Sequence, residues 1–311
     1  MAIKKSYILG VVVVIIFALL ILARPFYRNV IKPNKDIFPG FITRLIEARD
    51  NRQSPAPLVY KEEKTLKILE GWDLDDITKY LETETGLSPA DVEQVSGRPQ
   101  IDYRDETDLS FPPDFSEKFS FLKDKPAHYS LEGFLFPDTY RVFTDATAED
   151  VIFKMLTNFD RRLTAEMRAE IERQGKTIYE VIIMASLIEK EAPMNYSDPE
   201  NRDARIVSDI FWGRLKIGQA LQSDATLSYL FNDNNPAHSG EELRVDSPYN
   251  SYKYRGLPPT PICNPGIKAI EAAIYPIPTN YNYFLTNLDG SNIYYASTYE
   301  EHLQNKYKYL K

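Results

Sequence analysis

Cysteine, histidine and basic residues are all scarce in this chain. Cys263 is the only cysteine among 311 residues, so no internal disulfide can form, which is compatible with a protein exposed outside a bacterial membrane. One cysteine and three scattered histidines show no metal-ligand spacing, and no glycine-rich phosphate loop is present, so we expect no metal and no cofactor. The net charge of -8 argues against a nucleic-acid partner, because phosphate binding needs clustered lysine and arginine.

Apolar and aromatic residues, in contrast, are abundant. Hydrophobic residues make up 43% of the chain, enough for real cores, and the length predicts two domains with a small additional piece. Many of the 21 tyrosines fall near the C-terminus. Tyrosines suit a surface that stacks on and hydrogen-bonds to a polar polymer such as a glycan. They are also common in β-strands and in the packing of loops.

Residues 6–23 form an uncharged apolar stretch that follows Lys4 and Lys5. It is long enough to span a bilayer, and no small-residue cleavage site closes it, so we expect an uncleaved single-pass anchor within residues 1–30. Basic residues on the far side oppose a simple positive-inside assignment, but a large domain can be translocated regardless of them. We therefore expect a chain anchored in the cell membrane, with a cytoplasmic N-terminus and the residues from about 24 onward outside the cytoplasm.

Residues 31–130 are expected to form a small α/β module with proline-rich connectors. Its pattern predicts a short helix at 42–49, a strand at 65–69, a helix from Asp73 to Leu81 and a helix at 88–95. Asp73 is a suitable N-cap, and Ser88 before Pro89 is a typical helix start. A strand followed by two short helices resembles the front of a LysM-like glycan-binding module. A plain spacer between membrane and catalytic domain fits equally well.

Residues 131–311 carry the stronger patterns and are expected to form one larger domain. Apolar periodicity predicts helices at 147–162, 164–174, 178–192, 204–215 and 267–275. The segments 283–285 and 293–296 are typical of paired strands joined through Asp289-Gly290.

The helix predicted at 178–192 ends in two acids with different surroundings. Glu189 lies on the same face of the helix as Ile182, Ser186 and other small or apolar residues, so it is expected to be buried. Glu191 projects to the opposite side of the helix. Burial and the negative end of the helix dipole would raise the pKa of Glu189, as a general acid at neutral pH requires. A core glutamate satisfied by an arginine or a backbone group is the alternative that the helix alone leaves open.

Three downstream segments present polar side chains in a rigid setting. Their candidate ligands are Gln222, Asp224, Asn250, Tyr252 and Asn264, and the dense prolines between 248 and 265 fix the loop that holds the last of them. Glu132, beside a glycine and several aromatic residues, is a candidate for substrate binding or for support of the site. A purely structural loop system remains open at this point.

The motifs in their order resemble the endolytic murein transglycosylase (YceG-like) family. They are an N-terminal anchor, Leu-Glu-Gly-Phe-Leu-Phe-Pro-Asp-Thr-Tyr from 131, Ala-Ser-Leu-Ile-Glu-Lys-Glu from 185, Leu-Gln-Ser-Asp-Ala-Thr from 221, Ser-Pro-Tyr-Asn-Ser-Tyr from 247 and Gly-Leu-Pro-Pro-Thr-Pro-Ile-Cys-Asn-Pro-Gly from 256. The resemblance implies an α+β fold with a transmembrane helix, a LysM-like module and a larger catalytic domain. Ala225 and Asn292 depart from the family pattern, which has proline and histidine there.

The same resemblance implies an activity and a catalytic residue. It implies cleavage of the β-1,4 bond between N-acetylmuramic acid and N-acetylglucosamine in nascent peptidoglycan, with 1,6-anhydromuramic ends that terminate glycan elongation. The catalytic acid would be Glu189, and the partners would be glycan strands, the membrane and peptidoglycan synthases. Two alternatives stay open: hydrolysis by a carboxylate pair, with Asp224 or Glu132 opposite Glu189, and a non-catalytic peptidoglycan-binding scaffold.

Overall fold

The computed structural model describes residues 62–192, 194, 198–233, 235, 238–287 and 292–310. All of them belong to the second of the two compact units into which the chain divides, Lys61–Lys311. The apolar stretch at 6–23 and the short helix expected at 42–49 lie outside the described residues. None of the helices in the described part is long and apolar enough to cross a membrane.

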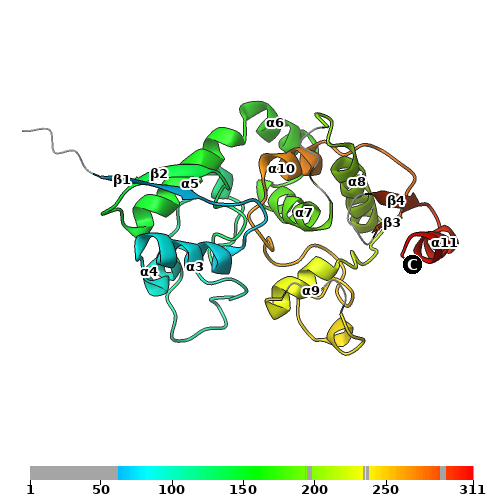
Figure 1. Ribbon diagram of the computed structural model, residues 1–311, viewed down its shortest axis with the longest axis horizontal. Coiled ribbons are helices and arrows are strands. Elements are labelled where there is room, and N and C mark those ends of the chain that lie inside the picture. Colours follow the sequence, from blue (N-terminus) through cyan, green and yellow to red (C-terminus); the bar gives the residue numbers. More distant parts are fainter. Residues whose placement is uncertain are drawn as a thin grey trace, which may run out of the picture. The chain divides into compact units, whose positions relative to one another are not determined.

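The first sheet joins two strands that lie far apart in the sequence. β1 (Glu63–Lys67) pairs antiparallel with β2 (Thr139–Phe143), so that Leu66 lies opposite Tyr140 and both point into the core. Between the strands come α3 (Leu74–Thr85) and α4 (Pro89–Ser96), which gives a βααβ unit (Figure 1). The sequence did not predict β2, which lies beyond residue 130. The βααβ unit therefore draws its second strand from the segment expected to open the catalytic domain.

Local sequence explains where these two helices begin. The side chain of Asp73 accepts a hydrogen bond from the backbone N–H of Asp76 at 2.9 Å, and Ser88 accepts one from Asp91 at 3.2 Å. Both N-caps were predicted, because a short polar side chain satisfies a backbone donor that the first helical turn leaves free. A long irregular connector that contains the 3₁₀ helix η3 (Ser120–Leu122) then leads to β2.

The larger part of the domain is built around α7 (Ile178–Glu191), in which every residue from Val181 to Ile188 is buried. Its strongest packing is against α10 (Ile267–Ile274), with α8 (Arg202–Lys216) on another side. Two further helices, α6 (Ala165–Arg173) and α9 (Asp224–Phe231), also contact α7, whereas α5 (Ala148–Arg162) packs against α4 and β2. The 3₁₀ helix η4 (Glu242–Arg244) lies in the loop after α9. A helix that is apolar all round belongs in a core, and Figure 1 shows α7 among these elements.

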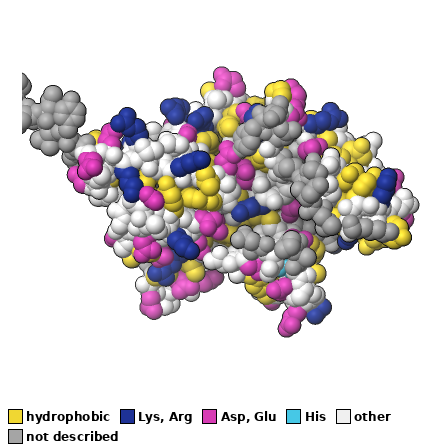
Figure 2. Space-filling model, in the orientation of Figure 1, with side chains coloured by type: hydrophobic (Ala, Val, Ile, Leu, Met, Phe, Trp, Pro, Cys, Tyr) yellow, Lys and Arg dark blue, Asp and Glu magenta, His cyan; other side chains and the backbone are white. Residues whose placement is uncertain are grey.

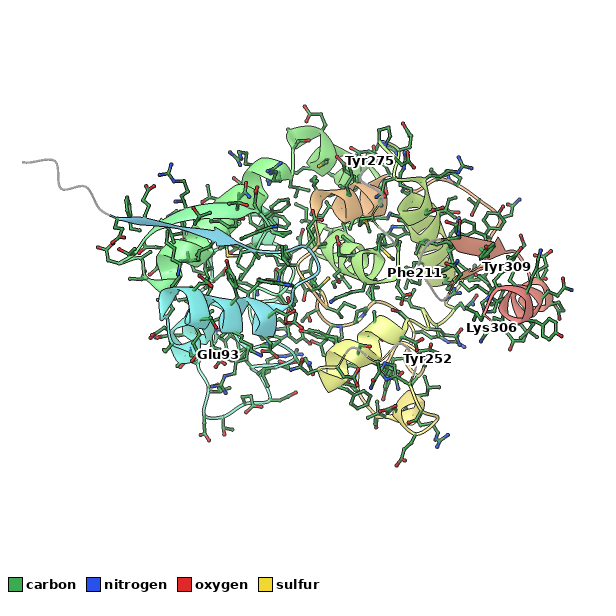
Figure 3. The ribbon with its side chains drawn as sticks, viewed as in Figure 1. Glu93, Phe211, Tyr252, Tyr275, Lys306 and Tyr309 are labelled. Atoms are coloured by element: carbon green, nitrogen blue, oxygen red, sulfur yellow. The ribbon has the colours of Figure 1, made fainter. Side chains whose placement is uncertain are left out.

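A hairpin and one further helix complete the chain. β3 (Tyr283–Thr286) and β4 (Ile293–Ala296) pair antiparallel, which confirms the predicted strand pair. α11 (Tyr299–Tyr309) follows with a capping box between Thr298 and Glu301, and the sequence did not predict it. α8 meets the hairpin through Phe211, whose ring lies edge-on to Phe284 at 5.7 Å (Figure 3).

One hydrophobic core connects the βααβ unit to α7. Phe121 and Phe159 stack at 4.6 Å between ring centroids, and Phe134 stacks nearly parallel on Tyr179 of α7 at 6.2 Å. Leu66 of β1 belongs to the same buried cluster as the apolar side chains of α7. Because these elements share one core, the position of the βααβ unit on the rest of the domain is set by packing. The mixed α+β architecture agrees with the expected fold class.

Candidate active site

The site begins at the C-terminal end of α7. Thr177 and Glu180 form a capping box at the start of the helix, which ends at Glu191, one residue before the predicted end at 192. Glu189 therefore lies in the last turn. Its side chain is half-buried, whereas the helical pattern predicted full burial.

Glu189 has the electrostatic character of a general acid. Its Oε2 accepts a hydrogen bond of 3.0 Å from the backbone N–H of Gly266, at the start of α10. Burial is the main factor that raises the pKa of Glu189 to about 7, and the nearby Glu70 raises it further, against the lowering effects of Gly266 and Lys190. The expected direction of the shift is thus present, with desolvation as its first cause. A carboxyl with this pKa is protonated in a large fraction of molecules at neutral pH.

Ser186 lies one helical turn before Glu189 and forms hydrogen bonds with the loop that carries Gly266. Its Oγ accepts a hydrogen bond from the backbone N–H of Ile262 at 3.0 Å, and its carbonyl accepts one from Cys263 Sγ at 3.4 Å. Ser186 and Glu189 share one face of the helix, as predicted from helical spacing. The proline-rich loop is therefore attached to α7 at two successive turns.

Asn264 connects that loop to two other segments of the domain. Its Oδ1 accepts a hydrogen bond from Leu135 N at 2.8 Å, and its Nδ2 donates to Trp72 O and to Glu132 Oε1, each at 3.0 Å. Its main chain also bonds to Trp72 O and to Gly71 N. The side chain is fully buried, with 0% exposure.

Glu132 completes the same buried network. Its exposure is 1%, and its Oε2 accepts hydrogen bonds from Leu74 N at 3.1 Å and from Tyr229 OH at 3.2 Å. Burial raises its pKa well above the usual range, with a further contribution from Asp73. Protein groups enclose both side chains, which hold three segments together. Glu132 thus has the geometry of the supporting role that was one of its two expected roles, whereas Asn264, expected to orient substrate, is buried instead.

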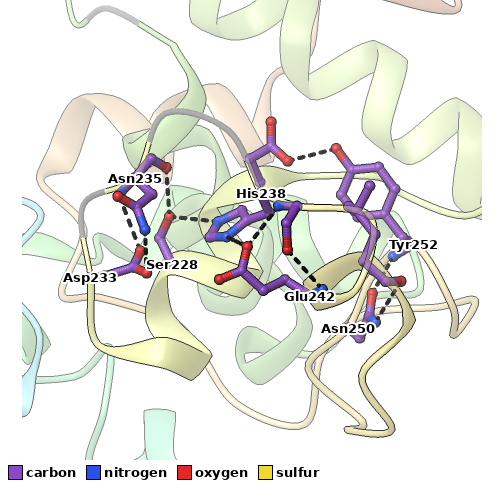
Figure 4. Close-up of polar contacts among 10 residues, drawn as sticks. Ser228, Asp233, Asn235, His238, Glu242, Asn250 and Tyr252 are labelled. Carbon is purple, nitrogen blue, oxygen red and sulfur yellow. Dashed lines mark hydrogen bonds and ion pairs between the residues drawn. The ribbon is translucent and has the colours of Figure 1, made fainter.

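Asn250 also differs from the expectation. It is fully buried, and its Nδ2 donates to the carbonyls of Leu243 and Val245 at 3.1 and 2.9 Å, while its Oδ1 accepts from Tyr252 N at 3.0 Å. Figure 4 shows the Asn250 side chain inside its loop. The same loop contacts α9, where His238 Nε2 lies 3.2 Å from Ser228 Oγ. Asn250 therefore shapes the loop and is not placed to touch a ligand.

Gln222, Asp224 and Tyr252 remain accessible. Gln222 is exposed and has a left-handed backbone, with a φ of 52°, and Tyr252 OH donates to Asp224 Oδ1 at 2.7 Å (Figure 4). The group lies at the start of α9, where Ser223 Oγ donates to Glu191 and the backbone of Ala225 bonds to the same carboxylate. Glu191 thus supports the end of α7 and the start of α9, as expected for the acid on the other side of the helix.

The turn between β1 and α3 brings two further residues to Glu189 that the sequence analysis did not select. Gly71 has a φ of +78°, and a Cβ there would lie 3.7 Å from Glu189 Cγ. Glu70 precedes it, is exposed, and has a pKa raised by burial of part of its side chain. The sequence signal was an acid beside a turn glycine, but only the tertiary packing places that acid at the end of α7.

Charge is mixed over the face drawn in Figure 2, where acidic and basic side chains are interspersed. Within the described ranges, no three or more histidine, cysteine, aspartate or glutamate side chains are grouped so that they could hold a metal ion. The carboxyl of Glu189, which burial desolvates and whose pKa is raised to about 7, is suited to proton transfer.

Comparison with known proteins places this arrangement in a family. The YceG-like family model matches residues 40–308. An endolytic murein transglycosylase of Bacillus subtilis (strain 168) is 30% identical over 245 residues, which cover 79% of this chain and 65% of that protein. The endolytic murein transglycosylase of Streptococcus pneumoniae serotype 2 is 30% identical over 250 residues, which cover 78% of this chain and 44% of that protein. The chain thus spans about two thirds or less of the length of these relatives.

A solved structure supports the same relationship. A 2.6 Å crystal structure of a putative YceG-like protein from Listeria monocytogenes matches with a TM-score of 0.64 and 30% identity, and the match covers 84% of this chain and 80% of that one. The sequence motifs, the family model and the fold agree. This chain belongs to the YceG-like family.

Proposed function

We propose that this protein is a peptidoglycan lytic transglycosylase that cleaves within glycan strands, with Glu189 as its general acid. The observation that carries the proposal is the carboxyl of Glu189, half-buried at the end of α7 with a pKa of about 7. The two relatives named above bear the name endolytic murein transglycosylase, which supports the same activity.

The reaction needs only one such acid. Glu189 protonates the oxygen that leaves with N-acetylglucosamine, and the C6 hydroxyl of the muramic residue attacks its own C1. The bond from C1 to the leaving oxygen breaks first, the C6 oxygen then bonds to C1 on the same face of the ring, and the carboxylate takes the hydroxyl proton. The product has a 1,6-anhydromuramic end, and no second carboxylate is required to activate water.

The accessible polar residues at the start of α9 are the substrate ligands in this proposal. Gln222, Asp224 and Tyr252 present amide, carboxylate and phenol groups that suit hydroxyl and N-acetyl groups of a glycan. The buried Glu132, Asn250 and Asn264 contribute by keeping the surrounding loops in place.

The N-terminal parts give the enzyme its setting. Residues 6–23 would anchor the chain in the cell membrane, with the catalytic domain outside the cytoplasm, where it could meet peptidoglycan synthases and end growing strands. The antiparallel pairing of β1 with β2 around α3 and α4 supports a LysM-like glycan-binding role for the βααβ unit.

Digestion of purified, uncrosslinked glycan strands tests the proposal. Mass spectrometry of the wild-type digest should show internal cleavage and 1,6-anhydromuramic ends. Glu189→Gln should lower the rate of both by at least about a hundredfold while it still binds the strands. Reducing muramic ends would show a hydrolase instead. A Glu189→Gln variant that retains full function in cells would favour a non-catalytic scaffold.

A further inference from the structure

Gly266 lies between two carboxylates. Its backbone N–H donates to Glu189 Oε2 at 3.0 Å, and the space on its other side, where a Cβ would stand, is filled by the side chain of Glu70. Glu70 Cγ lies 2.8 Å from that Cβ position, and the Glu70 carboxylate overlaps it. Both acids are therefore at the start of α10, and only glycine leaves room for them together.

Main-chain bonds on both sides hold Glu70 in this position. Ile68 N donates to Asp138 O and Gly71 N donates to Asn264 O, each at 3.0 Å. The left-handed backbone of Gly71 then turns the chain into α3, and Figure 1 shows this turn reaching from β1 toward α7 and α10. Among the described residues, no lysine or arginine forms an ion pair with Glu70.

We propose that Glu70 is a positioning residue of the active site, which the βααβ unit supplies to keep Glu189 in its protonated, acid-competent form. The inference rests on the proposed function in so far as that function needs Glu189 as an acid. It also means that the catalytic centre is shared between the two parts of the domain.

The physical reason is the repulsion between like charges. Two carboxylates against one helix start cannot both ionise without a penalty, so the more enclosed one retains its proton to higher pH. Glu70 raises the pKa of Glu189, whereas Lys190 on α7 and the N–H of Gly266 on α10 lower it. Lys190 also faces Asp73, the N-cap of α3: burial raises the pKa of Asp73, and Lys190 is among the groups that lower it.

The first test is the pH dependence of kcat/KM in Glu70→Gln. The alkaline limb should move down by about one pH unit, so that activity falls about tenfold above neutral pH and is unchanged at acid pH, because one pKa unit is a factor of ten. Glu82→Gln is the matched control, since it removes the same charge from an exposed position on α3 of the same unit. An equal loss at every pH, or an unmoved limb, would overturn the proposal.

Gly266→Ala provides a second route to the same result. The φ of Gly266 is -74°, which alanine adopts readily, and the N–H to Glu189 is retained, but the new Cβ must push the flexible Glu70 side chain away. The alkaline limb of the pH profile of kcat/KM should therefore move to lower pH, and Glu70→Ala should move it by the same amount. The double variant Glu70→Ala/Gly266→Ala should show no further shift; an additive shift would mean that Gly266 acts by another path.

Direct titration separates this inference from the reaction chemistry. In the full chain labelled with ¹³C at glutamate carboxyl carbons, the NMR signal lost in Glu189→Gln identifies Glu189. Its midpoint should fall by about one unit in Glu70→Gln and stay in place in Glu82→Gln. If the midpoint falls but no anhydro ends are produced, the proposed function fails alone. If anhydro ends are produced and the midpoint does not move, the role of Glu70 fails alone.

Discussion

Asn264 and Glu132 bond to each other across 3.0 Å, from Nδ2 to Oε1, at a place where neither side chain reaches solvent. The bond joins the proline-rich loop to the segment before β2, and further bonds from the same two side chains reach Trp72, Leu74 and Leu135. Unpaired polar groups in such a place are costly, so the network is expected to be sensitive to truncation.

Asn264→Ala should therefore lower the free energy of unfolding by about 3 kcal/mol, because it leaves Leu135 N and Glu132 Oε1 without a partner. Urea denaturation measures the change. Gln304→Ala on the exposed face of α11 is the control and should change stability little. A loss below about 1 kcal/mol for Asn264→Ala would show that the network does not hold these segments together.

Glu189→Gln should stabilise the fold at alkaline pH. The pKa of Glu189 is raised from 4.5 to about 7, so the folded state holds the proton more tightly than the unfolded state. The stability this contributes is complete below pH 4.5 and is lost as the pH rises to 7, where an ionised, partly buried carboxylate remains. At pH 8 the neutral glutamine avoids a penalty of about 3 kcal/mol, because each unit of pKa shift corresponds to about 1.4 kcal/mol.

Thermal unfolding at pH 8 and at pH 4.5 checks this prediction. The melting temperature of Glu189→Gln should exceed that of the wild type at pH 8 and equal it at pH 4.5. A variant that melts lower at both values would indicate that Glu189 stabilises the fold through its bond to Gly266.

Wild-type activity should fall as the pH rises above 7. A general acid acts only when protonated, and the pKa of Glu189 is about 7, so the rate should drop about tenfold per unit well above that value. Initial rates of strand cleavage between pH 5 and pH 9 measure the profile. A rate that continues to increase up to pH 9 would exclude Glu189 as the acid.

The two acids of the last turn of α7 should differ sharply in their effect on activity. Glu189→Gln removes the proton donor and should lower kcat by about 10²- to 10⁴-fold. Glu191→Gln keeps an oxygen for Ser223 and Ala225, so its activity should stay within about tenfold of the wild type. Rates on the same glycan strands, with circular dichroism to confirm folding, compare the two. Equal losses would contradict the assignment of separate roles.

Gly133→Ala should be strongly destabilising. Gly133 has a φ of +87°, and a Cβ there would lie 2.5 Å from Pro261 side-chain atoms and 3.0 Å from Ile182 Cγ2. Backbone strain and overpacking together should lower the free energy of unfolding by about 3 kcal/mol.

Gly175→Ala is the matched control for this substitution. Gly175 has a φ of +68° but no atom within 4 Å of a Cβ, so only the backbone strain, about 1 kcal/mol, should appear in urea denaturation. If both variants lose the same stability, close packing of Gly133 against Pro261 and α7 contributes nothing.

Prediction from sequence succeeded where contacts are local. The caps at Asp73 and Ser88, the length of α7 and the shared face of Ser186 and Glu189 depend on residues within a few positions of one another. It failed for β2, because Thr139–Phe143 becomes a strand by pairing with β1 at the other end of the βααβ unit. It also missed α11, whose polar sequence carries little periodicity.

The candidate site shows the same division. Asn250 and Asn264 were predicted to orient a substrate, and Glu132 to bind it or to support the site. Polar residues in rigid loops can serve either purpose, and only burial distinguishes the two. Glu70 was not selected, because nothing near it in the sequence links it to Glu189.

The sequence by itself therefore determined the family, the helix that carries the acid, and the separation of Glu189 from Glu191, since these follow from ordered motifs and from helical geometry. The tertiary structure decided which polar residues reach solvent and which second carboxylate stands beside Glu189. Those outcomes depend on packing between segments far apart in the chain, where burial and like-charge repulsion act through space.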